Sequence, residues 1–122
     1  MSTQVNKAIA RRYFERSWDE EDVVAADEIY AQDYLHLPPS PWQPAPRRRD
    51  EVRQVVARMR RVRPGSCVTI EDMIAEGDRV AIRWSLRQAG SPSMAAGITI
   101  QRIVDGRVVE VWDALSDSRA RV

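Results

Sequence analysis

Apolar side chains recur at helical spacing near the start of the chain. In residues 5–18 they form one stripe, made up of Val5, Ile9, Tyr13, Phe14 and Trp18. This spacing predicts an amphipathic helix. Asp22 fits the N-cap of a second, short helix that continues through Ile29 and Tyr30.

An irregular segment, LHLPPSPWQPAP, follows at residues 35–46. Its five prolines exclude a regular helix or a central strand. In so small a domain we expect such a segment to wrap the surface or to border a site. Residues 49–62 then return to helical spacing, and Pro64-Gly65 ends this third predicted helix. Its apolar face consists of Val52, Val55, Val56, Met59 and Val62.

The second half of the chain has the pattern of β-strands. Residues 79–88 alternate between apolar and polar side chains, which is the period of a half-buried strand. Three more β-rich runs predict strands at Cys67–Ala75, Met94–Val104 and Arg107–Asp113. Turn residues separate these runs, most clearly Asp105-Gly106, a strong hairpin signal. Helices followed by an antiparallel meander predict an α+β fold.

Length and composition narrow the class of protein. The 122 residues fit a single domain, and 43% hydrophobic with 30% charged residues is a globular composition. No apolar run approaches the roughly 18 residues of a membrane span, and the N-terminal residues are too charged for a secretory signal. We therefore expect a cytoplasmic protein. A lone Cys67 and the lack of Cys/His clusters argue against a disulfide or a metal site.

The charges nearly cancel, with 19 basic and 18 acidic residues, so no global field attracts nucleic acid or acidic lipid. Arginines nevertheless gather in one segment, which contains Arg47, Arg48, Arg49, Arg53, Arg58, Arg60, Arg61 and Arg63. Nucleic-acid binding would favour aromatic residues among them for stacking, and the segment has none. We interpret it as a solvated helix face.

Several phrases of the sequence resemble one family. They are AIARRYFERSWDEEDVVAADEIYAQDYL, DEVRQVVARMRRVRP, VTIEDMIAEGDRVAIRWSL and GITIQRIVDGRVVEVWD. Together they resemble the SnoaL-like polyketide cyclases of the nuclear transport factor 2-like superfamily. The resemblance implies three N-terminal helices packed on a curved antiparallel sheet, a cystatin-like cone with an internal pocket. Members of this fold perform several chemistries, so the fold alone does not choose a function.

Asp113 is the first site residue that the resemblance suggests. In SnoaL-like cyclases an acid at the end of the last strand, in a phrase like VEVWD, reaches into the pocket and serves as general base or acid. A carboxylate in an apolar cavity suits that role. The alternative is an Asp113 that caps the strand end or pairs with an arginine.

Comparison with two relatives brings in further residues. Arg83 matches a pocket arginine of limonene epoxide hydrolase, but Ser85 replaces its second aspartate, which argues against epoxide hydrolysis. Tyr13 matches the first-helix tyrosine of ketosteroid isomerase, a donor to an enolate oxygen. The other acids of that enzyme fall near Leu37 and Thr99, so isomerase chemistry is incomplete. We therefore favour Tyr13 as a core aromatic whose hydroxyl is satisfied over Tyr13 as a catalytic donor.

His36 and the proline segment complete the candidate site. His36, the only histidine, could exchange protons near neutral pH, or it could be a surface imidazole without a role. Trp42 could cover the pocket mouth or anchor the proline segment. Residues 86–97 are shorter than the resemblance leads us to expect, which would leave the pocket more open or leave its closure to residues 35–46. The other residues expected to contact substrate are Ser85, Thr99, Gln101 and Val111.

Three functions remain open. The first is an acid–base cyclase for a polyketide-like or other apolar carbonyl compound. In it Asp113 removes a proton, Arg83 or Tyr13 stabilises the enolate, and the pocket folds the substrate. The second is a non-catalytic module that binds a small ligand or fills the pocket with side chains. The third is an isomerase or dehydratase. No metal or organic cofactor is expected.

The alternation of the strands and the family resemblance predict opposite faces of the sheet for the same residues. Alternation alone turns Val80, Ile82, Trp84 and Leu86 to the core and Arg83 to solvent. The resemblance implies that Arg83 and Ser85 face the pocket with Thr99, Gln101, Val109, Val111 and Asp113. The opposite face would then be apolar, with Val80, Ile82, Trp84 and Leu86 joining Ile98, Ile100, Val108 and Trp112. A second copy of the chain would cover it, so we expect a homodimer with Trp84 and Trp112 near the contact.

Overall fold

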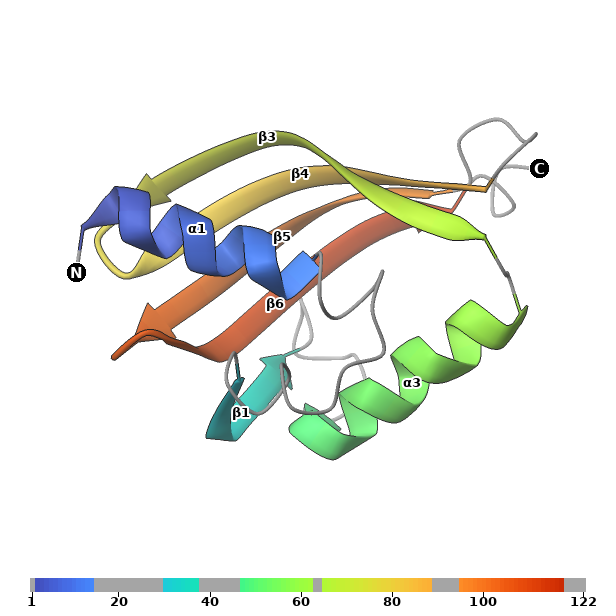
Figure 1. Ribbon diagram of the computed structural model, residues 1–122, viewed down its shortest axis with the longest axis horizontal. Coiled ribbons are helices and arrows are strands. Elements are labelled where there is room, and N and C mark those ends of the chain that lie inside the picture. Colours follow the sequence, from blue (N-terminus) through green and yellow to red (C-terminus); the bar gives the residue numbers. More distant parts are fainter. Residues whose placement is uncertain (1, 15–29, 38–46, 63–64, 89–94, 118–122) are drawn as a thin grey trace.

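The computed structural model describes residues 2–14, 30–37, 47–62, 65–88 and 95–117 (Figure 1). Within these ranges lie two helices, α1 (Thr3–Phe14) and α3 (Arg49–Val62). The strands are β1 (Tyr30–Leu37), β2 (Arg47–Arg48), β3 (Ser66–Glu76), β4 (Arg79–Gln88), β5 (Ala95–Val104) and β6 (Arg107–Asp117). The fold is therefore α+β. Neither described helix has the length and apolarity needed to cross a membrane.

The six strands form one sheet in the order β2-β1-β6-β5-β4-β3. Strands β3 to β6 are an antiparallel meander, as the alternation and turn residues predict. Strand β1, in contrast, pairs parallel with β6. The expectation of a purely antiparallel sheet was wrong: β1 and β6 are far apart in the sequence, so no hairpin requires them to run antiparallel.

The helices follow the predictions in part. Helix α3 occupies the predicted residues, and α1 begins two residues earlier than expected and is described to Phe14. The helix expected from Asp22 falls in residues 15–29, outside the described part, and its expected last residue, Tyr30, begins strand β1 instead. The described residues thus hold two of the three expected helices.

The irregular proline segment begins later in the chain than the sequence predicted. Residues 35–37 were expected to be irregular, but they complete β1, which lies between β2 and β6. The prolines begin only at Pro38, so these residues keep the backbone N–H groups that pair with a neighbouring strand. Residues 38–46, with Trp42, lie outside the described part.

Both helices pack on the same face of the curved sheet, which we call the inner face (Figure 1). Helix α1 contacts β3, β4 and β6, whereas α3 contacts β1 and β2. One core joins Ala10 and Tyr13 of α1 with Val52 of α3. The strands contribute Tyr30, Tyr34, Val80, Ile82, Ile103, Val108 and Val111 to the same core.

The register decides between the two predictions for the sheet faces. On β4, Val80 and Ile82 are fully buried while Arg83 is exposed, so simple alternation was right for this strand. On β5, Thr99 lies opposite Ile82, and both are inner-face residues. The resemblance was therefore right for Thr99 and wrong for Arg83. Val80, Ile82, Trp84, Leu86 and Val108 do not belong to an exposed apolar face.

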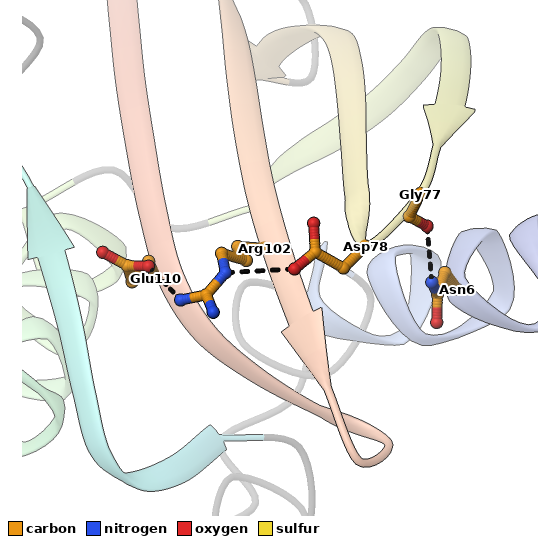
Figure 2. A network of polar contacts seen from close by, with 5 residues as sticks. All are labelled: Asn6, Gly77, Asp78, Arg102 and Glu110. Carbon is orange, nitrogen blue, oxygen red and sulfur yellow. Dashed lines mark hydrogen bonds and ion pairs between the residues drawn. The ribbon is translucent and has the colours of Figure 1, made fainter. Parts of the chain in front are cut away.

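Polar contacts fix α1 to the end of the meander (Figure 2). The Asn6 side chain donates to the carbonyl of Gly77 in the β3–β4 turn, 3.2 Å away. Beside this contact, Arg102 of β5 bridges Asp78 and Glu110, and these two carboxylates raise the pKa of its guanidinium. The bridge links the β3–β4 turn to β5 and β6.

Candidate active site

Asp113 and His36 form the centre of the candidate site. His36 lies on β1 opposite Val111, so the parallel register brings it beside Asp113, two residues further along β6. His36 Nε2 is 2.7 Å from Asp113 Oδ2. The two side chains are 23% and 24% exposed. The pair is therefore accessible, although it stands at the edge of a buried polar network.

The second carboxylate oxygen of Asp113 is also held. Thr99 lies directly opposite Asp113 on β5, and its hydroxyl donates to Oδ1. The Trp84 indole N–H in turn donates to the Thr99 hydroxyl oxygen at 2.8 Å. Because both oxygens accept a hydrogen bond, the carboxylate plane is fixed by β1 on one side and β5 on the other.

Tyr34 connects His36 to helix α1. The Tyr34 hydroxyl lies 3.1 Å from His36 Nδ1, and it hydrogen-bonds to the hydroxyl of Tyr13. A carboxylate can only accept, so in the neutral form of His36 the proton is on Nε2 and Nδ1 accepts from Tyr34. The donors thus run from Tyr13 through Tyr34 and His36 to Asp113.

Burial raises the pKa of Tyr13 and Tyr34, and neighbouring phenols and the Asp113 carboxylate raise that of Tyr13 further. Both hydroxyls therefore stay protonated well above neutral pH and remain donors. Tyr30 contacts both rings: its centroid lies 5.4 Å from that of Tyr13, in an edge-to-face arrangement, and 4.7 Å from that of Tyr34. These aromatic contacts hold β1 against α1 and so help to place His36.

The structure brings together several of the residues named from the sequence. Asp113, His36, Tyr13 and Thr99 belong to one hydrogen-bonded network. Gln101 and Val111 share the inner face with them but are completely buried, so they line no open space in this conformation. Both polar atoms of the Gln101 side chain are buried without a hydrogen-bond partner, which is costly for an amide.

Arg83 and Ser85 do not join this network. Since Trp84 faces inward, its two neighbours on β4 face outward. Arg83 is exposed and pairs in register with Ile98, on the outer face. Ser85 donates to the Glu71 carboxylate at 2.7 Å on that same face. Their assignment to the pocket was wrong. Trp42 lies outside the described residues.

Sequence reasoning missed Tyr34 and Trp84 as members of the network. Tyr34 is two residues before His36, so both side chains point to one face of a strand. The two-residue spacing of Tyr34 and His36 carried no information at the sequence level, because a strand was not predicted there. Trp84 was expected on the outer face. Its inward position follows from the alternation of β4, which places it two residues from buried Ile82.

The described part of the chain does not bring together a set of side chains that could bind a metal ion. No group of three or more His, Cys, Asp or Glu side chains is placed there to hold an ion. His36 and Asp113 hydrogen-bond each other directly. What the network offers is proton transfer by a carboxylate whose neighbours are all donors.

A family model for the SnoaL-like domain matches residues 10–111. The chain belongs to the SnoaL-like family. Solved structures of low sequence identity share its fold. One is IdmH from Streptomyces antibioticus, for which polyketide cyclase activity has been proposed. It is 22% identical, with 91% of each chain covered and a TM-score of 0.76.

Two other structures are similar to the same extent. A loop-truncated variant of IdmH gives 23% identity, coverage of 91% and 92%, and a TM-score of 0.79. AclR from Streptomyces galilaeus, for which hydroxylase activity has been proposed, gives 20% identity, coverage of 96% and 82%, and a TM-score of 0.78. No curated protein sequence matches this chain. These SnoaL-like relatives therefore support the fold, and the chemistry depends on the site itself.

Proposed function

We propose that this SnoaL-like protein is an acid–base enzyme that removes a proton alpha to the carbonyl of a small apolar compound, in the manner of a polyketide cyclase. The observation that carries the proposal is the His36–Asp113 pair, accessible to solvent and backed by buried donors. Asp113 is the base, because each of its oxygens keeps a second lone pair beyond the hydrogen bond it accepts.

The remaining roles follow from the positions of the candidate groups. Of the two groups expected to stabilise an enolate, only Tyr13 lies on the inner face; its hydroxyl is protonated at neutral pH, but it is buried and donates to Tyr34, so it would have to exchange that partner for the enolate oxygen. Arg83 is left without a catalytic role. The proposed cyclisation needs the substrate to be held folded, so that its carbanion meets an electrophilic carbonyl of the same molecule.

A non-catalytic binding module is the second candidate. The complete burial of Thr99, Gln101 and Val111 favours it, since part of the expected pocket is filled by side chains. The enzyme and the binding module differ in what they require of Asp113. Only the enzyme requires its carboxylate to be accessible to substrate. An isomerase or dehydratase would use the same proton abstraction, and the products would distinguish it.

Deuterium uptake tests the proposal. A panel of apolar ketones and keto-esters in D₂O, followed by proton NMR, should include members whose alpha protons exchange faster with the protein than without it. The exposed outer-face variant Arg83→Gln should exchange at the wild-type rate. Binding of panel members without any acceleration would support the binding module. Loss of activity in Arg83→Gln would restore the arginine to the site.

We also propose that the chain forms a homodimer through part of the surface expected from the sequence, which keeps Ile100 and Trp112 but excludes the inward-facing Trp84. On the outer face, Ile74, Ala81, Ile100 and Trp112 pair in register as one row across β3, β4, β5 and β6. Ile74 in this row is 66% exposed, and Ile98, which flanks the row on β5, is 53% exposed. A two-fold axis would bury the row against itself.

Sedimentation velocity at micromolar concentration should show a dimer for the wild-type chain and a monomer for Ile100→Asp. The substituted carboxylate would be buried without a partner in the contact. Ala96→Asp, on the same face but beyond the row, provides the matched control and should remain dimeric. A wild-type monomer would contradict the proposal and leave the row exposed.

A further inference from the structure

The indole of Trp84, a residue of β4, lies over the neighbouring strand β5 and reaches Thr99 on that strand. Trp84 pairs in register with Gly97, and Thr99 is the next inner-face residue along β5. The indole N–H donates to the Thr99 hydroxyl oxygen at 2.8 Å, and Thr99 is 1% exposed. A tryptophan of β4 thus takes part in the site through a threonine of β5.

Gly97 provides the space that the indole occupies over β5. A Cβ atom at residue 97 would lie 2.6 Å from Cζ2 and 2.9 Å from Cε2 of the Trp84 ring. It would also lie 2.9 Å from the backbone carbonyl oxygen of Ala114 on β6. Distances below 3.0 Å require the ring or the strand to move. Any larger residue would therefore displace the indole from its position over the strand.

The direction of the hydrogen bonds makes this arrangement specific. An indole N–H can only donate, so the Thr99 oxygen must accept from it. The single hydroxyl proton of Thr99 is then directed to Asp113 Oδ1. Without the indole, that hydroxyl could rotate and donate elsewhere. Trp84 thereby fixes the rotation of Thr99, and Thr99 fixes one edge of the carboxylate.

We infer that Trp84, seated by Gly97, is a positioning residue that acts through Thr99 to orient the Asp113 carboxylate toward substrate. The inference rests on the proposed function, in which Asp113 is the base. His36 holds Oδ2, so the Thr99 contact is what prevents the carboxylate from rotating about that single hydrogen bond. Orientation of this kind contributes to turnover more than to substrate binding.

Variants of Thr99 test the inference first. Thr99→Val keeps the shape but removes the hydroxyl, and we expect kcat for alpha-proton exchange to fall by about 10- to 100-fold with KM within about two-fold. Thr99→Ser retains the hydroxyl and should restore most of the activity. Equal losses in both variants, or a loss expressed in KM alone, would overturn the positioning role.

Variants that replace or displace the Trp84 indole provide the second test. Trp84→Phe removes the donor, and its kcat should fall as in Thr99→Val. Trp112→Phe, on the outer face, is the matched control and should keep the wild-type kcat. Gly97→Ala should displace the indole and reduce kcat in the same way, with circular dichroism used to verify folding. An unchanged kcat in Trp84→Phe would overturn the inference.

An NMR measurement separates failure of the inference from failure of the proposed function. The Trp84 indole N–H proton resonance should move upfield in Thr99→Val and stay in place in Thr99→Ser. The side-chain carboxyl ¹³C resonance of Asp113 should change in Trp84→Phe but not in Trp112→Phe. These shifts need no turnover, so they judge the positioning even if the wild-type protein exchanges no compound. Unchanged resonances would overturn it.

Discussion

Asp113→Asn should lower the rate of alpha-proton exchange by about 10²- to 10⁴-fold, the usual contribution of a positioned general base. The amide cannot act as the base, but it can replace the hydrogen bonds of the carboxylate. Its oxygen accepts from Thr99, and its nitrogen donates to His36 Nε2. A greatly reduced exchange rate with an intact fold is therefore the expected result.

The same variant should invert the tautomer of His36. With the nitrogen of the introduced amide as donor, Nε2 must become the acceptor, so the proton moves to Nδ1 and faces the Tyr34 hydroxyl. Long-range ¹H–¹⁵N correlation spectra distinguish the two tautomers. If exchange survives in Asp113→Asn and disappears in His36→Ala, then His36 is the proton carrier and the roles of the pair are reversed.

The second large effect concerns stability and the two faces of β4. Ile82 is fully buried and Arg83 beside it is exposed. Ile82→Ala should reduce the free energy of unfolding by about 2–5 kcal/mol, because it removes apolar contact and leaves a cavity. Arg83→Ala should change it by no more than about 0.5 kcal/mol, as expected for a surface position.

Urea denaturation of both variants measures these free energies, and two protein concentrations separate unfolding from dimer dissociation. A large loss in Arg83→Ala together with a small loss in Ile82→Ala would show that the faces are assigned the wrong way round. Comparing Ile82→Ala with Arg83→Ala is informative because the two residues are adjacent in β4. They lie on the same stretch of backbone and differ in the face of the sheet that they occupy.

The sequence predicted the meander and α3 well because their signals are local. Alternation over residues 79–88 and turn residues such as Asp105-Gly106 specify hairpins between neighbouring strands. Strand β1 was missed for the opposite reason. It pairs in parallel with the last strand of the chain, and nothing in the phrase YAQDYLHL indicates so distant a partner. Tyr34 was missed with it.

The candidate site was predictable only where two kinds of evidence were combined. Hydrophobic alternation placed Ile82 inward correctly, yet on β5 it would have buried Ile98, which is 53% exposed, and exposed Thr99, which is 1% exposed. The family resemblance placed Thr99 correctly and Arg83 wrongly. Polar residues on an inner face satisfy each other across strands, as Thr99 and Asp113 do, and such pairing is invisible in a single segment.

The parallel pairing of β1 with β6 also bears on how the site assembles. The meander can form from contacts between adjacent hairpins, whereas β1 must close a loop that spans most of the chain before it can dock. His36 is on β1 and Asp113 is on β6, so the pair exists only after that closure. Transient undocking of β1 would separate the two groups while the hairpins stay folded. Catalytic competence would then have its own equilibrium, distinct from the global stability of the protein.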